Sequence, residues 1–140
     1  MNPLQDYVPP TDPRLTQTEP SRPESAFAAA WDKYIPRDKA LVYSLDYQYP
    51  VADFYLDFAH PEAKVCVEID GKEWHSDPDA ILRDLKRETR LAHEGWQVIR
   101  LSYWQVTLQP MWCVMRVRAA IRVALGLPYD GPAQRKYPIV

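Results

Sequence analysis

The sequence contains few cysteines, little net charge and no long apolar run. Its 140 residues include only two cysteines, Cys66 and Cys113, which have no CxxC spacing. This argues against a structural zinc site and a disulfide scaffold, and favours a reduced, intracellular setting. Because the formal net charge is -2, any nucleic-acid binding must come from a local basic patch. No stretch approaches the ~20 apolar residues of a membrane span, and no secretory signal pattern is visible, so we expect a cytoplasmic or nucleoid-associated protein without a membrane partner.

What is present indicates one domain between two proline-rich ends. Residues 1–22 hold five prolines and predict an extended or disordered arm, residues 23–126 the domain, and residues 127–140 an irregular tail. Periodicity and turn residues predict helices over about 21–36, 77–94 and 110–125, and strands over about 41–49, 52–59, 64–70 and 97–101. On the two later helices, the expected core positions are Ile81, Leu82, Leu85, Leu91, Ala92, Trp112, Met115, Ala119 and Val123.

Two carboxylates end the apolar strand KVCVEIDG. Glu68 and Asp70 are two residues apart, so they project from the same face of that strand. Adjacent like charges repel each other, and a chain usually tolerates them for a bound cation or for proton chemistry. Alternation in 52–59 predicts that Asp53 and Asp57 join them on one face of the sheet, opposite an apolar face of Phe54, Leu56, Phe58, Val65, Val67 and Ile69. The alternative is that these acids are solvated side chains on a sheet face that water reaches.

The ordered segments YLDFA, VEIDGKEWH and RDLKRETRLAHEGWQVIRL carry a family resemblance. Together they resemble the PD-(D/E)XK nuclease superfamily, and within it the very-short-patch-repair-like (Vsr-like) endonucleases, which include domain-of-unknown-function family 559. The resemblance implies an α/β fold with a restriction-endonuclease-like core, in which helices flank a mixed, mainly antiparallel four-stranded sheet. It also implies a Mg²⁺- or Mn²⁺-dependent endonuclease that hydrolyses DNA phosphodiester bonds by nicking or double-strand cutting. A homodimer is one possible assembly for such an enzyme.

The resemblance also assigns roles to individual residues. Asp57 takes the place of the first catalytic aspartate and Glu68 that of the second acid, while Glu24 matches a first-helix glutamate. The implied metal ligands are Asp57, Glu68 and Asp70, with the carbonyl of Ile69 as a plausible addition. Asp84 matches an acidic position on the following helix.

One departure concerns the group that activates water. The superfamily's lysine is expected two residues after the second acid, where this chain has Asp70. Lys72 follows two residues later, and His75 resembles the general base of the mismatch-repair relatives. Histidine suits this role because its unperturbed pKa lies near neutrality. Both Lys72 and His75 therefore remain candidates for activating the attacking water.

A basic stripe on the helix over 77–94 is the predicted nucleic-acid contact. Arg83, Lys86, Arg87 and Arg90 recur at helical spacing and would bind phosphates without reading sequence. The alternative is an ordinary solvated face. Two other functions stay open: a catalytically silent nucleic-acid-binding or assembly module on the same fold, supported by the missing lysine, and a regulatory protein that acts through its proline-rich arms.

Overall fold

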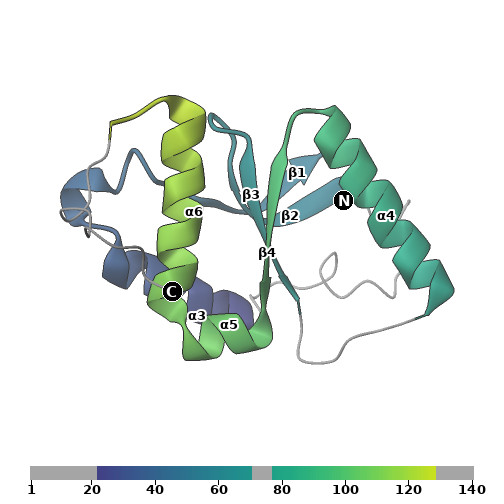
Figure 1. Ribbon diagram of the computed structural model, residues 1–140, viewed down its shortest axis with the longest axis horizontal. Coiled ribbons are helices and arrows are strands. Elements are labelled where there is room, and N and C mark those ends of the chain that lie inside the picture. The colour runs from purple at the N-terminus through teal and green to yellow at the C-terminus, as the bar shows by residue number, and fades with distance from the viewer. Residues whose placement is uncertain (1–21, 71–76, 129–140) are drawn as a thin grey trace, which may run out of the picture.

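The computed structural model describes residues 22–70 and 77–128. Four strands form one sheet in the order β1-β2-β3-β4, with the first three antiparallel and β4 parallel to β3 (Figure 1). The predicted α/β class, with a mixed four-stranded sheet flanked by helices, is confirmed. Within the described ranges, no helix has the length and apolar character needed to cross a membrane. In chain order the elements are α3 (Arg22–Tyr34), η1 (Arg37–Lys39), β1 (Asp46–Val51), β2 (Phe54–His60), β3 (Val65–Asp70), α4 (Pro78–His93), β4 (Gln97–Ser102), α5 (Tyr103–Leu108) and α6 (Pro110–Leu125).

Local signals explain where the helices begin and end. The Asp77 side chain accepts a hydrogen bond from the Asp79 amide and caps α4, with Pro78 in the first turn. Gly95 follows the helix with φ +87°, a conformation that glycine adopts without steric cost. Helix α5 was not expected. It begins directly at the end of β4, where Ser102 and Gln105 form a reciprocal capping box.

The helices form two layers around the sheet. Figure 1 shows α3, α5 and α6 on one side of the strands and α4 on the other. The larger core lies on the α3/α6 side and includes Phe58 together with Val65, Val67 and Ile69. A smaller core on the α4 side consists of Val51, Leu56, Ala59, Cys66, Leu91 and Trp96.

The expected alternation along β2 is wrong. Leu56 packs in the smaller core and Phe58 in the larger one, so the two side chains lie on opposite faces of the sheet. The neighbouring strand β1 changes face at the same level: Tyr47 contacts Phe58, whereas Tyr49 contacts Trp96. The cause in β1 is Gln48, whose φ of +53° reverses the direction of the side chains that follow. Asp53 also differs from expectation, because it lies exposed in the β1–β2 turn.

The predicted core positions of the later helices are partly wrong. On α4 only Leu91 is fully buried, whereas Ile81, Leu82 and Leu85 are 47%, 50% and 58% exposed. Trp112 and Val123 on α6 are also exposed. The face of α6 that packs against α3 and β3 is instead offset by one to two residues, and its buried residues are Cys113, Val114, Val117, Arg118 and Ile121.

Candidate active site

The candidate site lies where β2 and β3 separate. These strands pair at Phe58–Val67, Ala59–Cys66 and His60–Val65, and the regular pairing ends at Phe58 and Val67. Beyond that point, the Asp57 amide donates to Oε2 of Glu68 at 3.0 Å, and the Ile69 amide donates to Oδ2 of Asp57 at 2.8 Å. Each carboxylate therefore satisfies a backbone N–H of the opposite strand, which the ladder would otherwise leave without a partner. Asp57 and Glu68 are brought together as the sequence predicts.

An arginine on α4 holds the second acid. Glu68 is 3% exposed, and its Oε1 atom forms an ion pair with Nη2 of Arg87. The same Nη2 donates to the backbone oxygen of Tyr55 at 2.7 Å, and the guanidinium lies 5.4 Å from the ring centroid of Phe54. A buried carboxylate is costly unless it is paired, so Arg87 supplies the partner charge of Glu68 and fixes its orientation.

Asp70 lies at the rim of the same side of the sheet. Burial raises the pKa of Asp70, although the neighbouring guanidinium of Arg100 opposes that shift. Arg100 reaches Asp70 at 3.3 Å and Glu88 at 2.6 Å. Burial works against the charged form of Arg100, but the hydrogen bond and charge of Glu88 outweigh it and raise the pKa of Arg100. Asp70 thus belongs to a half-exposed network of charges with Arg100 and Glu88. It does not belong to the buried pair of carboxylates of Asp57 and Glu68, which we call the fork.

Glu24 approaches from the first turn of α3. It is buried, and its Oε1 atom accepts a hydrogen bond from the Tyr47 hydroxyl at 3.1 Å. Burial and the charge of Glu24 raise the pKa of Tyr47 to about 12, and the charge of Asp57 contributes in the same direction. The Tyr47 hydroxyl therefore keeps its proton at neutral pH and donates a hydrogen bond to Glu24. The charge of Asp57 in the fork also acts on this hydroxyl.

With this geometry in place, comparison with known proteins identifies the family. The REase_MTES_1575 family, a restriction-endonuclease-like family, matches residues 38–121, which is more than half of the chain. The chain belongs to this family. Its membership agrees with the predicted restriction-endonuclease-like core, and the matched segment contains Asp57, Glu68 and Asp70. The narrower Vsr-like assignment stays a prediction.

The chain is also similar to three uncharacterized bacterial proteins. It is 31% identical over 68 residues to Rv2248 of Mycobacterium tuberculosis, covering 45% of this chain and 25% of that protein. It is 39% identical over 57 residues to YcjD of Escherichia coli, covering 41% and 44%, and 32% identical over 72 residues to a Haemophilus influenzae protein, covering 51% and 58%. The chain thus spans between a quarter and somewhat over half of the length of these relatives. No solved structure matches it significantly.

Two of the other predicted site residues of this REase_MTES_1575 member, Lys72 and His75, lie outside the described residues. The remaining ones lie on α4. Asp84 is exposed, and its charge contributes to the raised pKa of Asp70, which places it near the rim. Arg87 differs from the expected exposed stripe, because it is 7% exposed and faces Glu68. Of the other stripe members, Arg83 and Lys86 are exposed, while Arg90 forms an exposed pair with Glu94 at 2.6 Å.

Sequence reasoning missed Tyr47 and Arg100. A signal for Arg100 was present in the parallel pair β3–β4, whose register sets Arg100 directly beside Glu68 and Leu101 beside Ile69. Alternation along QVIRLS would have given Arg100 the same face as Glu68. No such signal existed for Tyr47, since its contact with Glu24 joins residues 23 positions apart through the packing of α3 on β1.

Proposed function

We propose that this protein is a metal-dependent endonuclease that hydrolyses DNA phosphodiester bonds. The observation that carries the proposal is the fork, where the carboxylates of Asp57 and Glu68 lie side by side on adjacent strands, each fixed by a backbone amide. Membership of a restriction-endonuclease-like family supports the same reaction class. Hydrolysis of a phosphodiester needs an activated water, a fixed orientation and positive charge against the developing oxyanion.

The donor set of the fork fits a hard divalent cation such as Mg²⁺ or Mn²⁺. In the described ranges 22–70 and 77–128, no group of three or more His, Cys, Asp or Glu side chains is placed to hold a metal. Mg²⁺ nevertheless keeps several waters and is commonly held by one or two carboxylates. Asp57 and Glu68 would hold it, and waters would complete the coordination, because Asp70 lies apart in the rim network with Arg100. When bound, the cation would lower the pKa of water and neutralise charge on the phosphate.

Other residues of the chain would activate the water, orient the acids and bind the DNA backbone. His75 or Lys72 accepts the proton from the attacking water, while Tyr47 orients Glu24 toward the fork. Arg87 pairs with Glu68 and fixes its orientation, and the exposed Arg83, Lys86 and Arg90 contact backbone phosphates. A homodimer would supply two such sites for double-strand cutting, and a monomer would nick. In the cell we expect the protein in the cytoplasm or on the nucleoid.

The test is cleavage of plasmid, single-stranded and branched DNA, and of RNA, in Mg²⁺, Mn²⁺, Ca²⁺ or EDTA. We expect cutting of DNA in Mg²⁺ or Mn²⁺ alone. Asp57→Asn and Glu68→Gln should abolish cutting and keep binding in Ca²⁺, and His75→Ala should lower the rate by about 10²–10⁴ if it is the base. The exposed His93→Ala is the matched control. If His75→Ala cuts DNA at the wild-type rate, Lys72 becomes the residue assigned to activate the attacking water.

A second function is favoured by the ion pair itself. Arg87 already neutralises one of the two carboxylates of the fork, that of Glu68, without a cation. A catalytically silent nucleic-acid-binding or assembly module on this fold would look the same. It would bind DNA tightly and cut no substrate with any metal, and its melting temperature would not rise with Mg²⁺ or Mn²⁺.

A further inference from the structure

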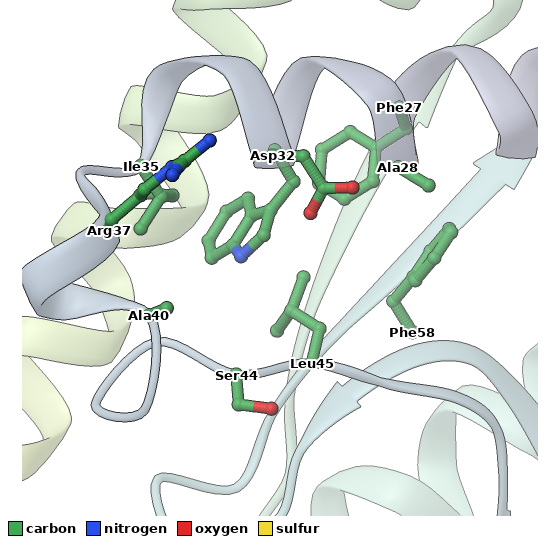
Figure 2. A pocket seen from close by; sticks show the side chains of 10 residues that line it. Phe27, Ala28, Asp32, Ile35, Arg37, Ala40, Ser44, Leu45 and Phe58 are labelled. Atoms are coloured by element: carbon green, nitrogen blue, oxygen red, sulfur yellow. The ribbon is translucent and has the colours of Figure 1, made fainter.

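A cavity lies on the opposite side of the sheet from α4. It has a volume of about 500 Å³ and lies between α3, the segment 35–45 and β2 (Figure 2). Ligand pockets in proteins typically fall in the range of about 300–1,000 Å³. The cavity is thus large enough for a ring-sized ligand, and the fork chemistry described above makes no use of it.

The floor of the cavity is aromatic and rigid. Phe27, Trp31 and Phe58 line it and are each less than 10% exposed. The Phe27 ring lies 5.1 Å from that of Phe58 and 5.8 Å from that of Trp31. The Trp31 indole N–H donates to the backbone oxygen of Tyr43 at 3.0 Å, which fixes the indole and ties α3 to the far wall. The cavity is therefore preformed rather than a gap between mobile side chains.

The rim of the cavity is polar and carries both signs of charge. Asp32 on α3, Arg37 on η1 and Ser44 in the following segment line it and are exposed. Figure 2 shows the Asp32 carboxylate and the Ser44 hydroxyl on opposite walls, with Arg37 at one end. An acceptor, a hydroxyl and a guanidinium around an aromatic floor suit a flat, polar-edged ring that is attached to a phosphate.

The cavity is connected to the fork through neighbouring residues. Phe58, on the cavity floor, follows Asp57 in β2, and its ring lies 5.5 Å from that of Tyr47. The Tyr47 hydroxyl in turn holds Glu24, which lies one turn before the cavity-lining Ala28 on α3. The same strand and the same helix thus carry both the acids and the cavity lining.

We propose that the cavity binds an unpaired nucleobase of the substrate strand, preferentially one with an exocyclic amino group, such as cytosine or adenine, rather than thymine. This rests on the proposed function, since it assigns a base of the bound strand. The Asp32 carboxylate accepts from the exocyclic amino group that cytosine, adenine and guanine have and thymine lacks. Arg37 lies against the attached phosphate. A base-paired nucleotide must first be unstacked, at a cost of a few kcal/mol, so single strands, bulges and ends are favoured over intact duplex.

The test is affinity in EDTA, where no cutting occurs, for short single strands of dC, dA and dT and for a matched duplex. We expect dC and dA to bind roughly tenfold tighter than dT, a difference that Asp32→Ala removes. Asp38→Ala is the matched control, because it removes the same charge from the exposed η1 helix outside the cavity lining. Ala40→Trp, at the exposed mouth, should weaken single-strand binding about 5- to 100-fold and leave duplex binding unchanged.

Each binding measurement tests the base cavity independently of whether the protein cleaves DNA. Equal affinities for dC and dT, or an Ala40→Trp variant that binds single strands like the wild type, would overturn the base cavity even if the protein cuts DNA. Loss of binding to single strand and duplex alike in Ala40→Trp would also overturn it. A base-selective wild type that cuts nothing would keep the cavity and remove the endonuclease.

Discussion

The two faces of the sheet are built differently. Among the described residues, sixteen buried hydrophobic residues form the core under α3, α5 and α6, whereas six form the core under α4. The α4 side instead carries the buried pair Glu68–Arg87 and the half-exposed network of Asp70, Arg100 and Glu88. The α3/α6 side thus holds the fold mainly by apolar burial, although it also buries Glu24 and Arg118, whereas the α4 side buries an ion pair beside a smaller apolar core.

This difference has a physical consequence for the site. A catalytic carboxylate needs a dry, fixed environment, and a fully apolar face would suppress its charge. The α4 face solves this by bringing in a guanidinium, whose planar donors serve both the Glu68 carboxylate and the Tyr55 carbonyl. Stability on this face therefore depends on an ion pair, and on the other face it depends on packing. Four substitutions test that contrast.

The largest effect is expected from Arg87→Met. It removes one partner of a buried ion pair and leaves the Glu68 charge in a low-dielectric site, which costs about 3–5 kcal/mol of unfolding free energy. Urea denaturation in EDTA measures the loss. Adding Glu68→Gln to Arg87→Met should recover most of it, because no uncompensated charge then remains.

The matched control for that variant is on the same helix. Arg90→Met removes a pair with Glu94 in which the arginine side chain is 53% exposed, and such pairs contribute at most about 0.5 kcal/mol. If Arg87→Met and Arg90→Met destabilise the protein equally, the α4 face does not depend on its buried pair, and the contrast between the faces fails.

The second prediction compares the loss of an isoleucine side chain on the two sides of the sheet. Ile121 is 0% exposed on α6, and Ile81 is 47% exposed on α4. Ile121→Ala should lose about 2–5 kcal/mol, because it removes buried methyl groups and leaves a cavity. Ile81→Ala should change stability by less than about 0.5 kcal/mol. Thermal and urea unfolding measure both, and a comparable loss in the two variants would mean that the exposed stripe of α4 is packed in solution.

These contrasts also show what the sequence could predict. The order of elements, the two strand-borne acids and the ends of α4 follow from local chemistry: Asp77 and Pro78 begin the helix, and Gly95 ends it. The fork of Asp57 and Glu68 was accessible because the family pattern identifies both residues, whereas the alternation expected along β2 is wrong.

The remainder depends on tertiary context. Nothing local indicates that Gln48 adopts a positive φ, yet after that residue the side chains of β1 change face, so that Tyr47 contacts Phe58 and Tyr49 contacts Trp96. Helical spacing identifies Arg87 as one member of a basic stripe but cannot show that it alone meets a buried carboxylate. Periodicity gives the face of a helix, and only packing decides which edge of that face is buried.

A smaller effect is expected from Tyr47→Phe, which removes the hydrogen bond to the buried Glu24. A bond to a charged group contributes about 1.5–3 kcal/mol, and the partial exposure of Tyr47 places the loss near the lower value. Burial and Glu24 raise the pKa of Tyr47 to about 12. The folded state therefore keeps a proton that the unfolded chain releases near pH ~10, and wild-type stability falls as the pH rises from about 10 toward 12. Unfolding measured across that range should fall less steeply in Tyr47→Phe, and equal slopes would contradict the contact.

The smallest effect concerns Asp70, at the boundary between the charged face and solvent. Burial raises the pKa of Asp70 above its ordinary 3.8, so the folded state binds the proton more tightly than the unfolded chain does. Stability from this group is present at low pH and is lost as the pH rises through the folded pKa. Asp70→Asn should therefore match the wild type near pH ~4 and be more stable near pH ~7, by less than about 1 kcal/mol because the side chain is partly exposed. Urea unfolding in EDTA at both pH values measures this, with the exposed turn variant Asp53→Asn as control. A less stable Asp70→Asn at neutral pH would mean that the pair with Arg100 outweighs burial, and that the rim, like Arg87, stabilises its face through charge.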